Sequence, residues 1–308
     1  MLQLGAWMQK AKAKGEDRNQ LQDLPQVDTA ELKLGRVFAS GAEADICFGV
    51  LWGQRVAVKQ LKPIRDDGEE KAASMIAAEL LHETRILSKL SHPRIMSLIG
   101  FTETPAQIVL ECLDGTIYDV VAAGVKGMPG GLLQPLGDVV AGMAYLHARS
   151  PPLLHRDLKP PNVLHLQMRC KIGDFGTAVE LPAGAPPTEW VGSQLYVAPE
   201  VDKEEVYGLP ADVFSFGVLA LELYHQLATG STYYGDTDLF AGGGLLEGLE
   251  MLRAPLVAHP PQQPTDLQPD CESIAVWKLL MACVTHNPAE RPTFRTVAHQ
   301  IGELIAAA

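Results

Sequence analysis

The stretch LLHRDLKPPNVL at residues 153–164, followed by the triplet DFG at residues 174–176, decides the fold of this chain. Two carboxylates, an amide and an amine lie here within eighteen residues, between apolar runs short enough to be strands. Asn162 and Asp174 offer the oxygen ligands that Mg²⁺ prefers, and substrate phosphates would complete its octahedron. Asp157 remains to orient a hydroxyl nucleophile and accept its proton, and Lys159 suits a phosphate in transfer. The set predicts phosphoryl transfer, in which positioning and charge neutralisation supply nearly all of the catalysis.

The same stretch resembles a known family. HRDLKPPN, with DFG starting twelve residues after its asparagine, is similar to the catalytic loop and metal loop of protein kinases. The resemblance covers residues 31–305 and implies an α+β fold with two lobes, a small β-rich N-lobe with helix C and a larger, mainly helical C-lobe. It divides the chain into an N-terminal extension (1–30), an N-lobe with hinge (31–113) and a C-lobe (114–308).

Composition limits the class of protein. The 308 residues are 47% hydrophobic and 20% charged, which is enough for one large domain or two lobes. The formal net charge of −12 makes nucleic acid and anionic membranes poor partners, and no apolar run reaches membrane-spanning length. A mild preference for basic protein substrates is compatible with this charge. Composition makes no prediction of oligomeric state.

Cysteine usage bears on the compartment. The five cysteines, at positions 47, 112, 170, 271 and 283, are odd in number, scattered and without a CxxC pair. This pattern favours a reducing compartment over a disulfide framework or a zinc site. The apolar start of residues 1–20 is too short for a signal peptide, and Glu16 and Asp17 disfavour a transit peptide. We expect a cytosolic protein, alone or shared with the nucleus.

A strand is predicted around Val56-Ala57-Val58-Lys59. Alternation places the two valines on one face and Ala57 with Lys59 on the other, so a lysine shares a face with a small residue that suits a flat ring. In the kinase resemblance this is the V-A-V-K strand, with Lys59 on the α- and β-phosphates of ATP and Ala57 at the nucleotide.

A helix is predicted over residues 72–90, because its leucines and isoleucine recur at helical spacing. Glu83 falls on this apolar stripe, and a carboxylate on a buried face needs a cationic partner. Lys59 is the candidate, and the resemblance implies the same pair. Glu79, one turn earlier, is the alternative.

The phosphate loop departs from the family pattern. Of its three glycines only the middle one, Gly41, is present; Ala39 and Ala44 replace the outer two, and Ile46 stands for the valine. Glycine permits close approach of backbone to phosphate, and alanine is the mildest replacement because it adds one methyl group. We expect the change to affect nucleotide affinity more than the fold.

The strand Gln107–Leu113 resembles the hinge segment whose backbone binds adenine. Alignment places Leu110 as gatekeeper and Glu111, Cys112 and Leu113 along the adenine edge. An ordinary strand end is the alternative for these residues.

Several C-lobe residues are expected to support the site. His155 resembles a structural residue that stacks on Phe175, and Asp212 opens a buried helix and anchors the catalytic loop. Arg291 resembles the family arginine that pairs with Glu200.

The activation segment follows Gly176. Arg156 resembles the arginine that pairs with an activation-loop phosphate, and Thr188 is the favoured phosphosite, with Thr177 and Ser193 as alternatives. Ser193 also matches the family position that contacts the catalytic lysine and aspartate.

The chain is identified as a serine/threonine protein kinase, because Lys159 in HRDLK is typical of that type. GQRVAVK, SFGVLALEL and NPAERPTF resemble the tyrosine-kinase-like group. The implied activity is transfer of the ATP γ-phosphoryl group, with Mg²⁺, to protein hydroxyls in signal transduction. A pseudokinase scaffold is the alternative that the changed glycine loop suggests, and the intact catalytic set opposes it. A small-molecule kinase is disfavoured by Ala198-Pro199-Glu200 and the long activation segment.

Overall fold

The computed structural model of the chain describes residues 24–40, 44–62, 70–125, 131–181, 186–229 and 271–307. Its contacts divide the chain into two units, Met1–Leu113 and Asp114–Ala308. Gly41, predicted for the phosphate loop, and residues 1–23 of the predicted extension lie outside the described residues.

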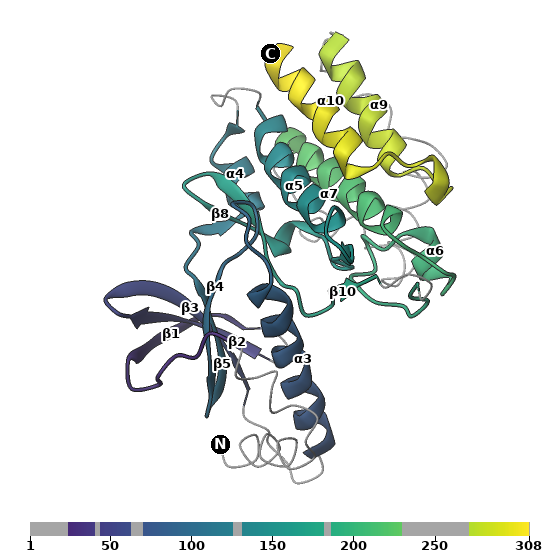
Figure 1. The fold of residues 1–308 in the computed structure, drawn as a ribbon. Coiled ribbons are helices and arrows are strands. Elements are labelled where there is room, and N and C mark those ends of the chain that lie inside the picture. Colours follow the sequence, from purple (N-terminus) through teal and green to yellow (C-terminus); the bar gives the residue numbers. More distant parts are fainter. Residues whose placement is uncertain are drawn as a thin grey trace, which may run out of the picture. The chain divides into compact units, whose positions relative to one another are not determined.

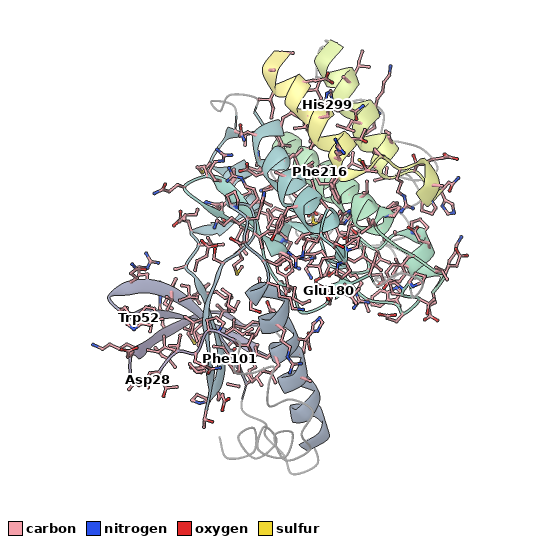
Figure 2. The ribbon with its side chains drawn as sticks, viewed as in Figure 1. Asp28, Trp52, Phe101, Glu180, Phe216 and His299 are labelled. Atoms are coloured by element: carbon pink, nitrogen blue, oxygen red, sulfur yellow. The ribbon has the colours of Figure 1, made fainter. Side chains whose placement is uncertain are left out.

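Five antiparallel strands in the order β1-β2-β3-β5-β4 form the sheet of the first unit (Figure 1). Their bounds are β1 Leu32–Ser40, β2 Ala44–Leu51, β3 Gln54–Leu61, β4 Leu98–Glu103 and β5 Ala106–Glu111. Strands β2 and β3 are joined by Trp52 and Gly53, whose φ angles of 51° and 78° are both left-handed. Two such residues make the tight turn whose twist matches that of a hairpin. Figure 2 labels Trp52 at this turn, with 65% of the residue exposed.

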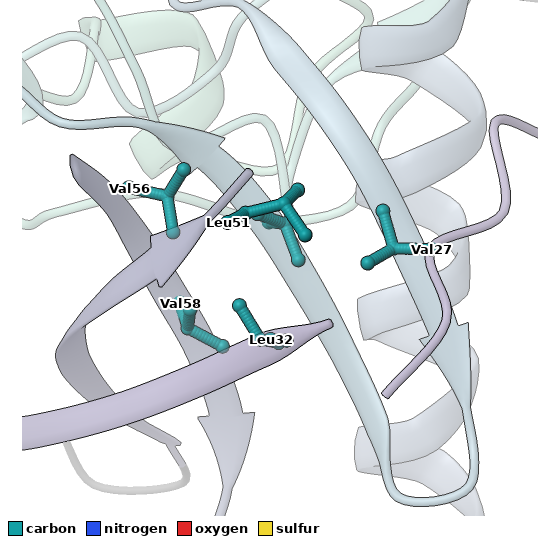
Figure 3. Close-up of a cluster of buried hydrophobic side chains, with 6 residues drawn as sticks. Val27, Leu32, Leu51, Val56 and Val58 are labelled. Carbon is teal, nitrogen blue, oxygen red and sulfur yellow. The ribbon is translucent and has the colours of Figure 1, made fainter. Parts of the chain in front are cut away.

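The predicted alternation of β3 is confirmed. Val56 and Val58 are buried in a cluster (Figure 3) that also contains Val27, Leu32, Leu51 and Val109. The opposite face carries Ala57 and Lys59, as predicted. Helix α3 (Glu70–Ser88) contacts β4 and β5, and its Leu80 and Leu87 are buried. The helix therefore ends two residues before the predicted limit, and it places its apolar stripe against the sheet.

The last residues of the predicted extension of residues 1–30 pack against the sheet of the first unit. Leu24 and Val27 are buried, and residues 25–27 form a short parallel bridge with β4. The N–H of Val27 donates to the carbonyl of Phe101 at 3.0 Å, and the N–H of Phe101 donates to the carbonyl of Pro25 at 2.8 Å. This segment thus belongs to the first unit, because its apolar side chains complete the core beneath the sheet.

Shortening Val27 tests this packing. Val27→Ala is expected to lower the free energy of unfolding by about 2 kcal/mol, because it removes two buried methyl groups. Lys33→Ala, on an exposed position of β1, should change it by less than about 0.5 kcal/mol. Urea denaturation measures both values. Equal small effects would contradict the core position of Val27.

Helices dominate the second unit (Figure 1). Those in the described residues are α4 Ile117–Ala122, α5 Leu133–His147, α6 Pro199–Asp202, α7 Pro210–Thr229, α9 Cys271–Cys283 and α10 Phe294–Ala307. Two short sheets accompany them, β6 (Gly115–Thr116) with β8 (Val163–Leu166) and β9 (Arg169–Ile172), and β7 (Leu153–Leu154) with β10 (Val179–Glu180). None of the helices in the described ranges combines the length and the apolar character needed to cross a membrane.

Helix α7 lies in the core of this unit. Its residues from Ala211 to Leu223 are buried on all sides, including Phe216, labelled in Figure 2. Helix α5 packs against α10, and α7 packs against α4 and α9. The buried helix predicted to open at Asp212 begins two residues earlier, because proline is favoured in the first turn of a helix. Asp212 is therefore held in the first turn of the most buried helix.

Candidate functional site

The catalytic-loop residues of the second unit lie between β7 and β8, and Pro160–Asn162 form one turn of 3₁₀ helix. The side-chain amide of Asn162 donates to the carbonyl of Asp157 at 2.8 Å and to its Oδ2 at 3.0 Å. Lys159 Nζ lies 2.8 Å from the same Oδ2. The other oxygen, Oδ1, is buried and has no hydrogen-bond partner among the described residues. One carboxylate oxygen is thus held in place, and the other is left for an incoming group.

Lys159 also reaches the activation segment. Its Nζ donates to Ser193 Oγ at 2.6 Å. The predicted contact of Ser193 with the catalytic lysine is therefore present. The amine is held between a carboxylate and a hydroxyl, so its charge stays beside Asp157.

The DFG segment is fastened to the catalytic loop through Gly173. The N–H of Gly173 donates to the carbonyl of Asn162 at 2.8 Å, and its carbonyl lies 3.0 Å from His155 Nε2. The ring of Phe175 is fully buried and meets that of His155 edge-on at 5.0 Å, as predicted. Asp174 follows in a left-handed conformation, with φ of 58°. This backbone links Asp174 to Asn162.

The donor set fits a divalent cation. Asn162 and Asp174 both carry hard oxygens. The side-chain nitrogen of Asn162 donates both of its hydrogen bonds to Asp157, so the amide oxygen remains as the atom that could bind a metal ion. Within the described residues no three His, Cys, Asp or Glu side chains gather to form a metal cluster. Two protein oxygens match a cation that obtains its other ligands from phosphates and water.

The catalytic loop is anchored by Asp212. This carboxylate accepts the backbone N–H groups of His155 and Arg156, each at 2.9 Å, and lies 2.9 Å from His147 Nε2. Burial raises the pKa of Asp212, but the hydrogen bond and charge of His147, with the contributions of His155, outweigh burial and hold the pKa below its ordinary value. The predicted role of Asp212 as the anchor of this loop agrees with these bonds.

Acid should release this anchor. Because the pKa of Asp212 is lower in the folded chain than its ordinary value of 3.8, its stabilising effect is full at higher pH and is lost as the pH falls through the folded pKa. Asp212→Asn is expected to lower the free energy of unfolding by about 3 kcal/mol at pH 7. Denaturation as a function of pH should show this difference shrinking below about pH 4. A difference that stays constant to pH 2 would contradict the lowered pKa.

The first unit contains the predicted pair of Lys59 and Glu83. Lys59 Nζ lies 2.6 Å from Glu83 Oε2, and the Glu83 side chain is only 3% exposed. The alternative, Glu79, is exposed. In the sheet Lys59 pairs with Ile46, which pairs with Ala39. These two residues of the predicted phosphate loop therefore lie in one cross-strand row with the lysine.

The predicted hinge residues have structural contacts of their own. Glu111 Oε1 accepts the backbone N–H of Ser97 at 2.7 Å, which fixes this carboxylate to the end of the sheet. Cys112 Sγ accepts from Arg55 Nη2 at 3.7 Å. Ala57 is buried and pairs with Leu110, the predicted gatekeeper. Adenine binding by this segment stays a prediction.

A buried ion pair joins Glu200 and Arg291, as predicted. The two guanidinium nitrogens Nη1 and Nη2 donate to the two carboxylate oxygens at 2.6 and 2.8 Å. Three carbonyls accept the remaining guanidinium hydrogens, those of Thr285, Pro210 and His286. The arginine thus ties the helix after the activation segment to the segment before α10.

Removing one partner isolates a buried charge. Arg291→Met is expected to lower the free energy of unfolding by about 3–5 kcal/mol, because Glu200 would lose its counter-ion. Arg295→Met, at an exposed position of α10, should have an effect below about 0.5 kcal/mol. Thermal and urea denaturation would both report the difference. A loss no larger than that of the control would contradict the importance of the pair.

Helix α7 contains a further buried carboxylate, Glu222, that was not predicted from the sequence. Glu222 of α7 is fully buried and accepts the hydroxyls of Tyr118, at 2.6 Å, and of Tyr196. The signal was present, since an acidic residue in a helix apolar on all sides needs buried partners. It could not indicate which residues those partners were.

Comparison with known proteins establishes the family. A profile described as protein kinase domain matches residues 39–301. This match covers well over half of the chain, so the chain belongs to the protein kinase domain family. The predicted family and the α+β kinase fold are confirmed.

Curated relatives share this domain within longer proteins. Serine/threonine-protein kinase STY46 of Arabidopsis thaliana is 31% identical over 92% of this chain and 46% of its own length. Mitogen-activated protein kinase kinase kinase 12 of Rattus norvegicus is 31% identical over 92% of this chain and 28% of its own length. Cyclic GMP-binding protein C of Dictyostelium discoideum is 28% identical over 91% of this chain and 11% of its own length. The chain therefore spans less than half the length of each, and its likeness is to serine/threonine kinase domains.

Proposed function

We propose that this domain transfers the γ-phosphoryl group of ATP to serine or threonine hydroxyls of a protein substrate. The proposal rests on the hydrogen bonding of the two carboxylate oxygens of Asp157. Its Oδ2 is held by Asn162 and Lys159, and its buried Oδ1 has no partner among the described residues. A buried acceptor oxygen left open beside a fixed amine suits a hydroxyl nucleophile.

The residues of the second unit have separate roles in the transfer. Asp157 orients the substrate hydroxyl and takes its proton as the oxygen attacks the γ-phosphorus and the bond to the β-phosphate oxygen breaks. Lys159 lies 2.8 Å from the same carboxylate and neutralises charge on the moving phosphoryl group. Asn162 and Asp174 would hold Mg²⁺, which supplies charge neutralisation on the phosphates.

The first unit supplies the cation for the nucleotide. Glu83 holds Lys59 by a bond of 2.6 Å on the face that also carries Ala57 and Ile46. Because the glutamate is buried and bonded to the amine, the direction of the lysine side chain is fixed. We propose that Lys59 binds the α- and β-phosphates of ATP, as the matching lysine does in protein kinases.

The proposal includes serine and threonine as the residues phosphorylated and the cytosol as the location. Lys159 and its contact with Ser193 are typical of serine/threonine kinases, and relatives such as STY46 carry that name. We propose a signalling role in the cytosol. Among the described residues, the thiols of Cys47, Cys112 and Cys283 are outside any disulfide, which suits a reducing compartment.

Substitution of the proposed base tests the activity. Asp157→Asn is expected to lower kcat for labelling of a serine/threonine peptide from Mg-ATP by about 10²–10⁴-fold, because the amide cannot accept the proton. Asp28→Asn makes the same chemical change at a surface turn where Asp28 caps the N–H of Ala30, and it should leave kcat unchanged. The labelled amino acid, identified by mass spectrometry, decides serine and threonine against tyrosine.

The same assay separates the two candidate classes. Equal labelling by wild type and Asp157→Asn would contradict the assigned base. No labelling by either, with Mg-ATP still bound in a thermal-shift assay, would support a pseudokinase scaffold. Transfer of phosphate to a small molecule when no peptide is present would instead support a small-molecule kinase.

A further inference from the structure

Arg156, the residue before the proposed base, lies between the catalytic loop and the activation segment. Its side chain is only 12% exposed, and its φ of 67° is left-handed. Its backbone N–H is bound by Asp212 at 2.9 Å. The guanidinium is therefore a largely buried charge on a fixed backbone, and it requires anionic or carbonyl partners.

Three segments satisfy this guanidinium. Its Nε donates to the carbonyl of Thr177 at 2.6 Å, after the DFG triplet. Its Nη1 donates to the carboxylate of Glu189 and, at 3.3 Å, to the hydroxyl of Tyr207. The Tyr207 hydroxyl in turn donates to the carbonyl of Glu189 at 3.0 Å. One arginine thus binds the start of the activation segment at Thr177, its middle at Glu189, and Tyr207 after α6.

The activation segment also touches the catalytic loop through its backbone. Gly192 has φ of 115°, and a β-carbon there would overlap the carbonyl oxygen of Arg156. Only glycine allows this close approach. Next to it, Ser193 accepts the hydrogen bond of Lys159 at 2.6 Å. The position of Glu189 is therefore coupled to residues that adjoin the proposed base.

Glu189 is suited to remain ionised. Its own backbone N–H, and then the hydrogen bond and charge of Arg156, lower the pKa of its carboxyl below the ordinary value, against the effect of burial. Its side chain is 56% exposed, so the pair is partly screened by water, although the side chain of Arg156 is only 12% exposed. The carboxylate of Glu189 therefore binds the same guanidinium that a phosphate on the activation segment would bind.

We propose that Glu189 is a positioning residue, which orders the activation segment on Arg156 and supports phosphoryl transfer without phosphorylation of that segment. The inference rests on the proposed kinase function. It replaces the expected phosphate switch at Thr188 by a permanent contact. The N–H of Thr188 donates to Glu189 Oε2 at 3.3 Å, so a phosphate on Thr188 would stand beside a carboxylate that already neutralises the arginine.

Enzyme treated with a phosphatase, and shown by mass spectrometry to carry no phosphate, is the material for the test. Wild type and Thr188→Ala should then have equal kcat. Glu189→Gln should lower kcat about fivefold or more, with the KM for ATP changed less than about twofold, and Glu189→Asp should restore part of kcat. In an Arg156→Gln background, Glu189→Gln should change kcat by less than about twofold, because the partner is already absent.

A second measurement does not depend on turnover. Hydrogen exchange of the amides of residues 188–196 should be faster in Glu189→Gln than in wild type, and equal in the two variants that carry Arg156→Gln. Should the wild type bind Mg-ATP and transfer nothing, the proposed function fails, and this exchange result alone decides whether Glu189 orders the segment.

Two results would overturn the inference while the kinase function stands. The first is a wild-type enzyme that loses its activity on phosphatase treatment together with a Thr188→Ala variant that is inactive. That result would support the phosphate switch at Thr188 predicted from the sequence. The other is a Glu189→Gln enzyme with full activity and unchanged exchange, or one equally impaired with and without Arg156.

Discussion

The buried carboxylate of Asp212 is the constraint on which the catalytic loop depends. It accepts two consecutive backbone N–H groups, those of His155 and Arg156, and contacts His147. A buried carboxylate must be fully hydrogen-bonded, so the loop has one low-energy path past the start of α7. Asp157 follows directly on that path. The most buried helix of the second unit therefore sets the position of the proposed base, although it contributes no group to the chemistry.

Buried charges elsewhere follow the same logic. Glu200 meets Arg291, Lys59 meets Glu83, and each partner lies far along the chain from the other. Such pairs contribute less to net stability than their Coulomb energy suggests, because both charges lose water, but breaking one is costly. They select one arrangement of elements over its alternatives. Asp157 is different, because one of its two oxygens is buried and left open. This unsatisfied acceptor costs stability at the point where a substrate hydroxyl would satisfy it.

The negative charge that binds Arg156 can come from a phosphate on the activation segment or from a carboxylate in it. A phosphate brings nearly two negative charges and several acceptor oxygens, and it can be removed. The carboxylate of Glu189 brings one charge, half exposed, and it cannot be removed. Its contact with Arg156 is consequently weaker than that of a phosphate but always present. The bonds of Tyr207 and the close approach at Gly192 share the work of holding the segment.

The sequence by itself determined the family, the strand alternation around Lys59 and the buried Glu83, and it predicted the proposed catalytic set from Asp157 to Asp174. These depend on spacing within one element or one loop, where local geometry leaves few choices. Only the tertiary structure decided that residues from Leu24 onward complete the core of the first unit, that two tyrosines satisfy Glu222, and that Glu189 contacts Arg156. In the sequence Glu189 is one exposed acidic residue among many. Its proposed role arises because folding brings it to Arg156, a largely buried cation 33 residues away, and such long-range pairing is set by packing and not by local pattern.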